Sequence, residues 1–137
     1  MIRLILRLAL VICGLSLVLL IAVCLVDIPQ GDAARGEVLY FGVSSPYLPC
    51  FQCHEMPNIA PNMSGLTERV RQERLSQPEN AGQTIEEYLA ESVIDPQRYI
   101  VPPYNDLMPA FWSSNFSGFH RITLIDLQDI VAYLMTL

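Results

Sequence analysis

Cys50, Cys53 and His54 are the residues of this chain whose types and spacing are best suited to chemistry. Two thiols three residues apart lie on one turn of helix, so both can add across the two vinyl groups of one haem. The imidazole that directly follows can then reach the haem iron from the proximal side. The C-x-x-C-H spacing therefore predicts one covalently bound haem c, with His54 as a ligand of its iron.

Three other uses of a cysteine pair fit the sequence less well. A thioredoxin-like redox pair belongs to a βαβ setting, and the sequence has no strand pattern. A zinc site needs two more ligands at normal spacing, but His120 is the other histidine of the chain and no second C-x-x-C occurs. A structural disulfide across two intervening residues would close too small a loop to stabilise much. Haem attachment is the favoured interpretation.

The second axial ligand must come from the far side of the haem. Met108 lies in a proline-rich loop, far enough from His54 in sequence to fold over the opposite face of the haem. His120 is the competing ligand and would give a lower reduction potential than a methionine. The remaining methionines lie too close to His54 or in the last predicted helix: Met56, Met63 and Met135. The expected metal ligands are His54 and Met108.

The N-terminal part of the chain is apolar. Residues 8–26 contain no charged side chain, and a helix of about 19 residues spans roughly the 30 Å core of a bilayer. Arg3 and Arg7 precede this run, which places the N-terminus in the cytoplasm and the rest outside. Residues 1–27 are therefore expected to form a cytoplasmic start and a transmembrane anchor. A cleaved signal peptide and a lipid on Cys24 are the alternatives.

The chain beyond the apolar run is acidic and contains no lysine. Six arginines and 14 acidic residues follow residue 26, which gives a net charge of −8. Nucleic acid is a poor match for such a surface, because its binding depends on neutralising phosphates. A partner with a basic docking face, or one that the domain never leaves, fits better.

Helices are expected to position these residues, in an all-α domain over residues 32–137 that a short linker, 28–31, precedes. The expected helices cover residues 33–41 (capped by Asp32), 66–75, 84–94 (opened by a capping box of Thr84 and Glu87) and 123–137. A proline-rich segment, 101–109, lies between the last two of them. Loops of this length in a small domain usually surround a bound group.

Residues 32–137 resemble the class I cytochrome c family. Gly36 and Tyr40 match a glycine and an aromatic residue of the family's N-terminal helix, which meet its C-terminal helix. Residues 61–69, P-N-M-S-G-L-T-E-R, are similar to the family's P-x-L-x-G…R segment, and residues 81–111 look like bacterial members. The resemblance implies an all-α fold class in which an N-terminal single transmembrane helix is followed by a cytochrome c-like domain.

The resemblance also implies roles for single residues. By this resemblance, Nδ1 of His54 donates a hydrogen bond to the carbonyl of Pro61, which orients the histidine as a ligand. The carbonyl of Pro57 is a less favoured alternative. It gives haem packing to Met63 and the approach to a haem propionate to Arg69, whose alternative is an exposed helix arginine. Three aromatic residues could edge the haem or pack in the core: Tyr99, Tyr104 and Trp112.

A haem with both axial positions filled has no open site for a small-molecule substrate, so the chain is expected to be an electron carrier and not itself an enzyme. The expected location is the bacterial cytoplasmic membrane, with the haem domain on the periplasmic side. The expected partners are the membrane and other electron-transfer proteins or complex subunits. The favoured role is one-electron transfer within a respiratory or photosynthetic complex. A tethered electron shuttle and a haem-based gas sensor are the alternatives.

Overall fold

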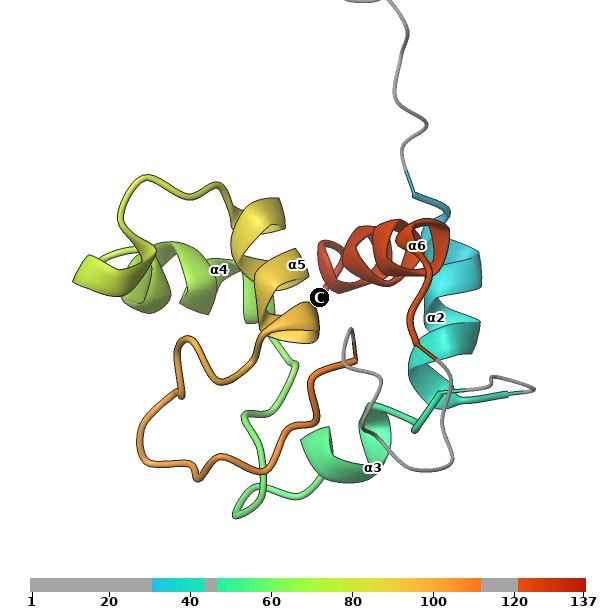
Figure 1. The fold of residues 1–137 in the computed structure, drawn as a ribbon, viewed down its shortest axis with the longest axis horizontal. Coiled ribbons are helices and arrows are strands. Elements are labelled where there is room, and N and C mark those ends of the chain that lie inside the picture. Colours follow the sequence, from blue (N-terminus) through green and yellow to red (C-terminus); the bar gives the residue numbers. More distant parts are fainter. Residues whose placement is uncertain (1–30, 44–46, 112–120) are drawn as a thin grey trace, which may run out of the picture.

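The computed structural model describes residues 31–43, 47–111 and 121–137, and within these ranges the chain is helical, without strands. Its elements, in chain order, are α2 (Ala33–Phe41), α3 (Phe51–His54), α4 (Leu66–Arg69), the π-helical η1 (Val70–Arg74), the 3-10 turn η2 (Pro78–Asn80), α5 (Ile85–Ile94) and α6 (Leu124–Leu134). Figure 1 shows α2 and α6 side by side, with α5 near the end of α6 and α4 beyond α5. The fold is thus built around the pairing of the first and last described helices.

The predicted fold class is wrong in adding a membrane-spanning helix to this helical domain. No helix within the described ranges is long and apolar enough to cross a membrane. The longest of these helices, α6, has 11 residues, whereas a span needs about 20. The predicted anchor at residues 8–26, together with Cys24, lies outside the described residues. The fold class is corrected to a helical domain without a transmembrane helix in the part that the structure describes.

Helix α2 begins and ends at local signals that the sequence carries. The side chain of Asp32 accepts hydrogen bonds from the backbone N–H groups of Ala34 (2.9 Å) and Arg35 (3.2 Å), as its position before the helix predicts. Gly42 ends the helix in the left-handed region, with φ at 71°, and its N–H donates to the carbonyl of Leu39. The predicted helix over residues 33–41 is confirmed.

The helix predicted over residues 66–75 forms with a change of pitch. It starts as α4, but from Val70 it widens into the π-helical η1, where the N–H of Leu75 donates to the carbonyl of Val70 at 3.0 Å. The spacing of the apolar residues explains the widening. Leu66 and Val70 are four residues apart, whereas Val70 and Leu75 are five apart, and all three pack in the core. A turn closed between residues five apart keeps Val70 and Leu75 on one side.

Helix α5 carries the predicted capping box. The N–H of Glu87 donates to the side-chain oxygen of Thr84 at 3.2 Å, and the N–H of Thr84 donates to the carboxylate of Glu87 at 2.7 Å. This reciprocal pair satisfies backbone donors that have no partner within the helix. The predicted start of the helix is confirmed.

Helix α6 begins as predicted and ends earlier. The side chain of Thr123 accepts from the N–H of Asp126 at 3.1 Å, but the helix ends at Leu134, three residues short of the expected end at Leu137. After Leu134 the chain continues in tighter turns, in which the N–H groups of Thr136 and Leu137 donate to the carbonyls three residues before them, at 2.9 and 3.2 Å. The carbonyl of Leu137 accepts from the backbone N–H of Thr67 at 3.2 Å, which joins this end of the chain to the α4 region.

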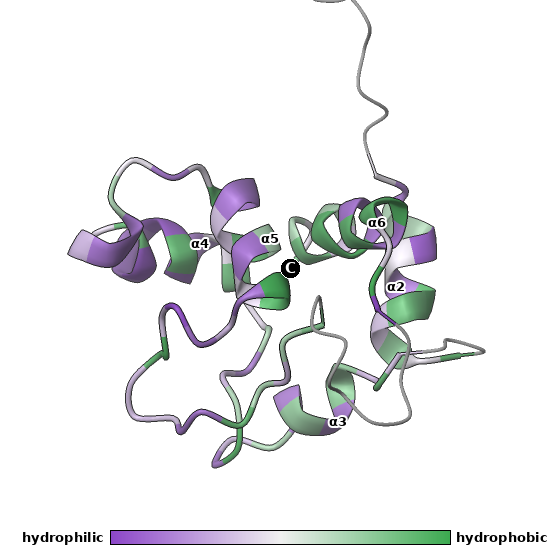
Figure 2. Ribbon diagram, viewed as in Figure 1, coloured by the Kyte–Doolittle hydropathy of each residue, from purple (hydrophilic) through white to green (hydrophobic). Residues whose placement is uncertain are grey.

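Helices α2 and α6 touch at backbone level. A Cβ atom on Gly36 would lie 1.9 Å from the carbonyl oxygen of Asp129, so only glycine allows this approach. One turn on, the rings of Tyr40 and Tyr133 have centroids 5.4 Å apart. Figure 2 shows the mostly hydrophobic ribbon of α6 beside α2. The predicted meeting of Gly36 and Tyr40 with the C-terminal helix is confirmed.

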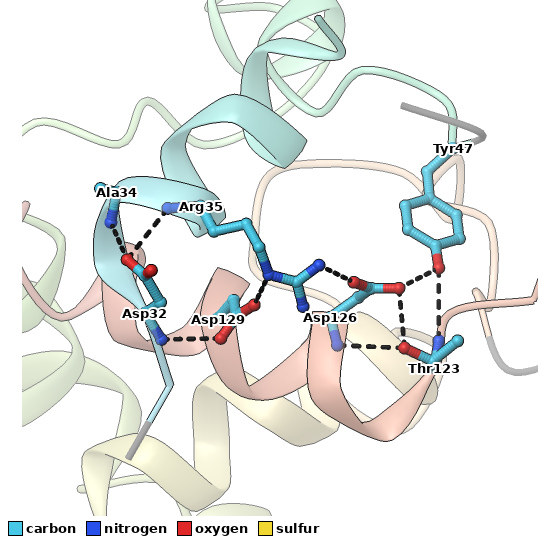
Figure 3. Close-up of polar contacts among 7 residues, drawn as sticks. All are labelled: Asp32, Ala34, Arg35, Tyr47, Thr123, Asp126 and Asp129. Carbon is cyan, nitrogen blue, oxygen red and sulfur yellow. Dashed lines mark hydrogen bonds and ion pairs between the residues drawn. The ribbon is translucent and has the colours of Figure 1, made fainter. Parts of the chain in front are cut away.

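A polar network locks the same two helices together (Figure 3). The guanidinium of Arg35, on α2, pairs with Asp126 at 2.8 Å and with Asp129, both on α6. Asp129 is buried and also accepts from the backbone N–H of Asp32 at 2.6 Å, while the hydroxyl of Tyr47 donates to Asp126 at 2.5 Å. A buried carboxylate is tolerated only with such partners, so the network fixes how α2, α6 and the segment at Tyr47 meet.

Candidate functional site

A cavity lies between α3, the α4–η1 helix, α5 and residues 96–111. Its volume, counted as the space open to the centre of a water-sized sphere, is about 170 Å³. The walls are mostly apolar and include Val70, Leu89, Val93 and Phe111. The cavity therefore offers a bound group partly open, mostly apolar surroundings.

Helix α3 brings the cysteine pair and the histidine to one wall of the cavity. Cys50, Cys53 and His54 all line it, because the N–H groups of Cys53 and His54 both fold back to the carbonyl of Cys50, at 3.3 and 3.2 Å. The backbone N–H of Cys50 donates to the carbonyl of Tyr40 at 3.0 Å. This bond ties the motif to the end of α2.

Both thiols of the motif are free and partly buried. Burial raises the pKa of Cys50 to about 11, so this group is a neutral thiol at neutral pH. The two cysteines line one cavity as free thiols. Two thiols lining one apolar cavity fit the donor set that covalent haem attachment requires.

His54 is buried and held by one hydrogen bond. Its Nδ1 donates to the carbonyl oxygen of Pro61 at 2.8 Å, since a carbonyl can only accept. Pro61, and not Pro57, is thus the partner. Burial lowers the pKa of His54, and the bond to Pro61 opposes this shift without cancelling it. The imidazole is neutral, with the lone pair on Nε2, as a metal ligand requires.

Met63 and Arg69, for which the family resemblance implies haem contacts, both line the cavity. The guanidinium of Arg69 donates to the backbone carbonyls of Asn62 and Ser64. It therefore braces the segment that follows Pro61. Contacts of Met63 and Arg69 with a haem remain predictions.

Met108 also lines the cavity and is partly buried. Two of the rival methionines do not line it: Met56 is exposed, and Met135 packs beside the core. His120, the other rival for the axial position, lies outside the described residues. Among the described methionines, Met108 and Met63 are thus the ones that reach the cavity, and Met63 follows the histidine by only nine residues.

Gln97 is a functional candidate that sequence reasoning missed. Its side-chain Nε2 donates to the backbone carbonyl of Met108 at 2.9 Å and to Oδ1 of Asp106 at 3.1 Å. The one amide group thus uses both of its protons to hold the loop that carries Met108. A glutamine after Asp95-Pro96 gives no pattern from which this contact could be read.

Two of the three aromatic candidates lie at the cavity. Tyr99 and Tyr104 line the cavity, and the Tyr99 ring meets that of Tyr88, a further lining residue, at 6.4 Å between centroids. Trp112 lies outside the described residues. Tyr88, on α5, was not singled out from the sequence, because its place on the wall depends on how α5 packs.

The zinc alternative finds no support in the described part of the chain. No three side chains of histidine, cysteine, aspartate or glutamate come together there as a metal site. Comparison with known proteins found no matching family model, no similar curated protein and no similar solved structure. The residues of the site itself are therefore what bears on the function of this chain.

Proposed function

We propose that this chain is a c-type cytochrome that carries one covalently bound haem and transfers single electrons. The observation that carries the proposal is the convergence of the C-x-x-C-H motif and Met108 on one mostly apolar cavity. Cys50 and Cys53 would hold the haem through thioether bonds, and His54 and Met108 would be the axial ligands of its iron. The haem, when bound, supplies one-electron chemistry, and the chain sets its potential and exposure.

His54 is prepared for the role of proximal ligand. The bond of its Nδ1 to the Pro61 carbonyl, at 2.8 Å, fixes both the tautomer and the orientation of the ring. Its lowered pKa, caused by burial, keeps it neutral, so no proton competes for Nε2 near neutral pH. A hydrogen bond to the far ring nitrogen also raises the basicity of the ligating one.

The rest of the cavity favours a high reduction potential and a partner protein. A thioether ligand such as Met108 raises the potential of a haem, and apolar walls penalise the additional charge of the oxidised state. With both His54 and Met108 bound to the iron, no position would remain for a substrate, so the partner in the reaction would be another redox protein. The net charge of −8 after residue 26 favours one with a basic docking face.

Covalent haem attachment is the first test. The full chain is expressed in cells that attach haem to exported C-x-x-C-H proteins, and the denatured protein is examined by haem staining and by its pyridine haemochrome spectrum. We expect one haem that stays on the chain, and none on a Cys50→Ala/Cys53→Ala variant. A Cys13→Ala/Cys24→Ala variant is the matched control and should keep its haem. A wild-type chain that leaves these cells without covalent haem overturns the proposal.

The axial ligands are tested on the haem-loaded protein. Met108→Ala should lose the absorption band of a thioether-ligated ferric iron and should bind carbon monoxide in the ferrous state, because one axial position becomes open. Met56→Ala is the matched control, since Met56 is exposed and does not line the cavity. An unchanged spectrum in Met108→Ala would refute the axial assignment. Ready binding of carbon monoxide by the wild type would favour the gas sensor instead.

Copurification distinguishes a subunit of an electron-transfer complex from an electron shuttle. A stable subunit of an electron-transfer complex stays with its neighbours through detergent and salt, whereas a shuttle is released by salt because its docking is electrostatic. Identification of the copurifying proteins from native cells names the partner in the first case.

A further inference from the structure

Arg74 is a charged side chain on the wall of an otherwise mostly apolar cavity. Only 16% of its side chain is exposed. It pairs with Glu73 at 3.1 Å, but the side chain of Glu73 is 51% exposed, and an exposed pair contributes little. A largely buried guanidinium needs stronger partners than this one to offset its lost hydration.

The π-helical turn explains why Arg74 reaches the cavity. In an α-helix, residues five apart are rotated by about 140° and point to different sides. Across η1, the i to i+5 turn brings such residues back toward one side, and Arg69 and Arg74, five apart, both line the cavity. Arg71 lies between them, pairs with Glu68 and has 60% of its side chain exposed. The same segment thus carries one arginine that does not line the cavity and two that do.

The backbone at Arg74 is held by a buried neighbour. Nδ2 of Asn80, which is fully buried, donates to the backbone carbonyl of Arg74 at 3.0 Å. Tyr88, on α5, lines the same cavity as Arg74. Arg69 differs, because its guanidinium already donates to the carbonyls of Asn62 and Ser64.

We infer that Arg74 binds a carboxylate of the bound haem, one of its propionates, and that Arg69 mainly braces the 61–69 segment. This inference rests on the proposed haem function. A guanidinium presents a planar fork of donors that matches a carboxylate, and such charge-assisted pairs are the strong ones. The pair would neutralise the buried charge of Arg74 and keep the propionate ionised inside the protein.

Loss of the Arg74 charge should change both the midpoint potential of the haem and the pKa of the propionate, each in one direction. An unpaired anionic propionate favours the more positive ferric state, so the midpoint potential at neutral pH falls. The same propionate holds its proton more tightly, so the pKa that links the potential to pH rises. A carboxylate next to an arginine usually has a pKa about 1 to 3 units lower than normal, and this is the expected size of the rise.

The experiment measures the midpoint potential of the haem-loaded full chain as a function of pH. We expect Arg74→Gln to lower the neutral-pH potential and to move the pH-dependent region upward by about 1 to 3 units. Arg71→Gln is the matched control, one exposed arginine on the same segment, and should titrate like the wild type. Arg74→Lys keeps the charge without the fork and should show a smaller shift in the same direction.

The outcomes separate this inference from the proposed function. A wild type without covalent haem overturns the proposed function. A haem-loaded Arg74→Gln that titrates like Arg71→Gln overturns the assignment of Arg74 alone. If Arg74→Gln accumulates no haem-loaded protein, Arg74→Lys decides, and a titration identical to that of the wild type again overturns the assignment.

Discussion

Gln97 should hold Met108, the proposed distal ligand, in place, and its removal should loosen the proposed bond between Met108 and the haem iron. The side-chain amide of Gln97 donates to the carbonyl of Met108 at 2.9 Å and to the carboxylate of Asp106 at 3.1 Å. Both acceptors belong to the loop that contains Met108, the proposed axial ligand. Gln97→Ala removes both bonds and leaves the cavity wall intact, because Gln97 itself does not line it.

The size of the effect follows from these two bonds. A hydrogen bond contributes about 0.5 to 1.5 kcal/mol net, and Gln97 is exposed, so the two together stabilise the ordered loop by about 1 to 2 kcal/mol. This energy corresponds to a factor of roughly 5 to 30 in the equilibrium between the ligated and the released methionine. Gln97→Glu should act in the same direction, because a carboxylate cannot donate to either oxygen.

Competition with imidazole measures that equilibrium. Imidazole binds the ferric iron only when the methionine is released, so its apparent affinity rises with the released fraction. Titration of haem-loaded Gln97→Ala, followed through the thioether band, should show an affinity for imidazole about 5 to 30 times that of the wild type. Gln77→Ala is the control, since Gln77 donates to the carbonyl of Glu73 at 3.1 Å, outside the methionine loop. Equal affinities in the two variants would refute the reasoning.

Two further predictions concern the frame that carries the site. Gly36→Ala places a Cβ atom 1.9 Å from the carbonyl oxygen of Asp129, which should cost about 1 to 3 kcal/mol and lower the melting temperature by about 4 to 8 °C per kcal/mol; an unchanged melting curve would contradict the close approach. Burial alone would raise the pKa of Asp126, but bonds from Tyr47 and Thr123 and the charge of Arg35 outweigh it and lower that pKa. The ionised carboxylate therefore contributes stability above its ordinary pKa of 3.8 and loses it as the pH falls through the lower folded value. Tyr47→Phe should cost about 1 kcal/mol at pH 7, with a smaller difference below about pH 4 in urea denaturation; a difference independent of pH would count against this account.

The sequence by itself determined the features that depend on neighbouring residues. The C-x-x-C-H motif places its three side chains on one turn, wherever that turn lies in the fold. The caps at Asp32 and Thr84 fixed where two helices begin, because a cap is a contact over two or three residues. Gly36 is the case in which a family resemblance anticipated a tertiary contact, since no other residue tolerates a helix at that distance.

Only the tertiary structure decided which distant residues share the cavity. The π-helical turn directs Arg74 to the wall, and the fold of residues 96–111 brings Gln97 to the carbonyl of Met108. Neither contact leaves a periodic or local signal, because each depends on how separate segments pack. The membrane helix expected from hydropathy has no counterpart among the described helices. Apolar composition measures what a segment can bury, whereas the packing of the folded chain decides which side chains meet.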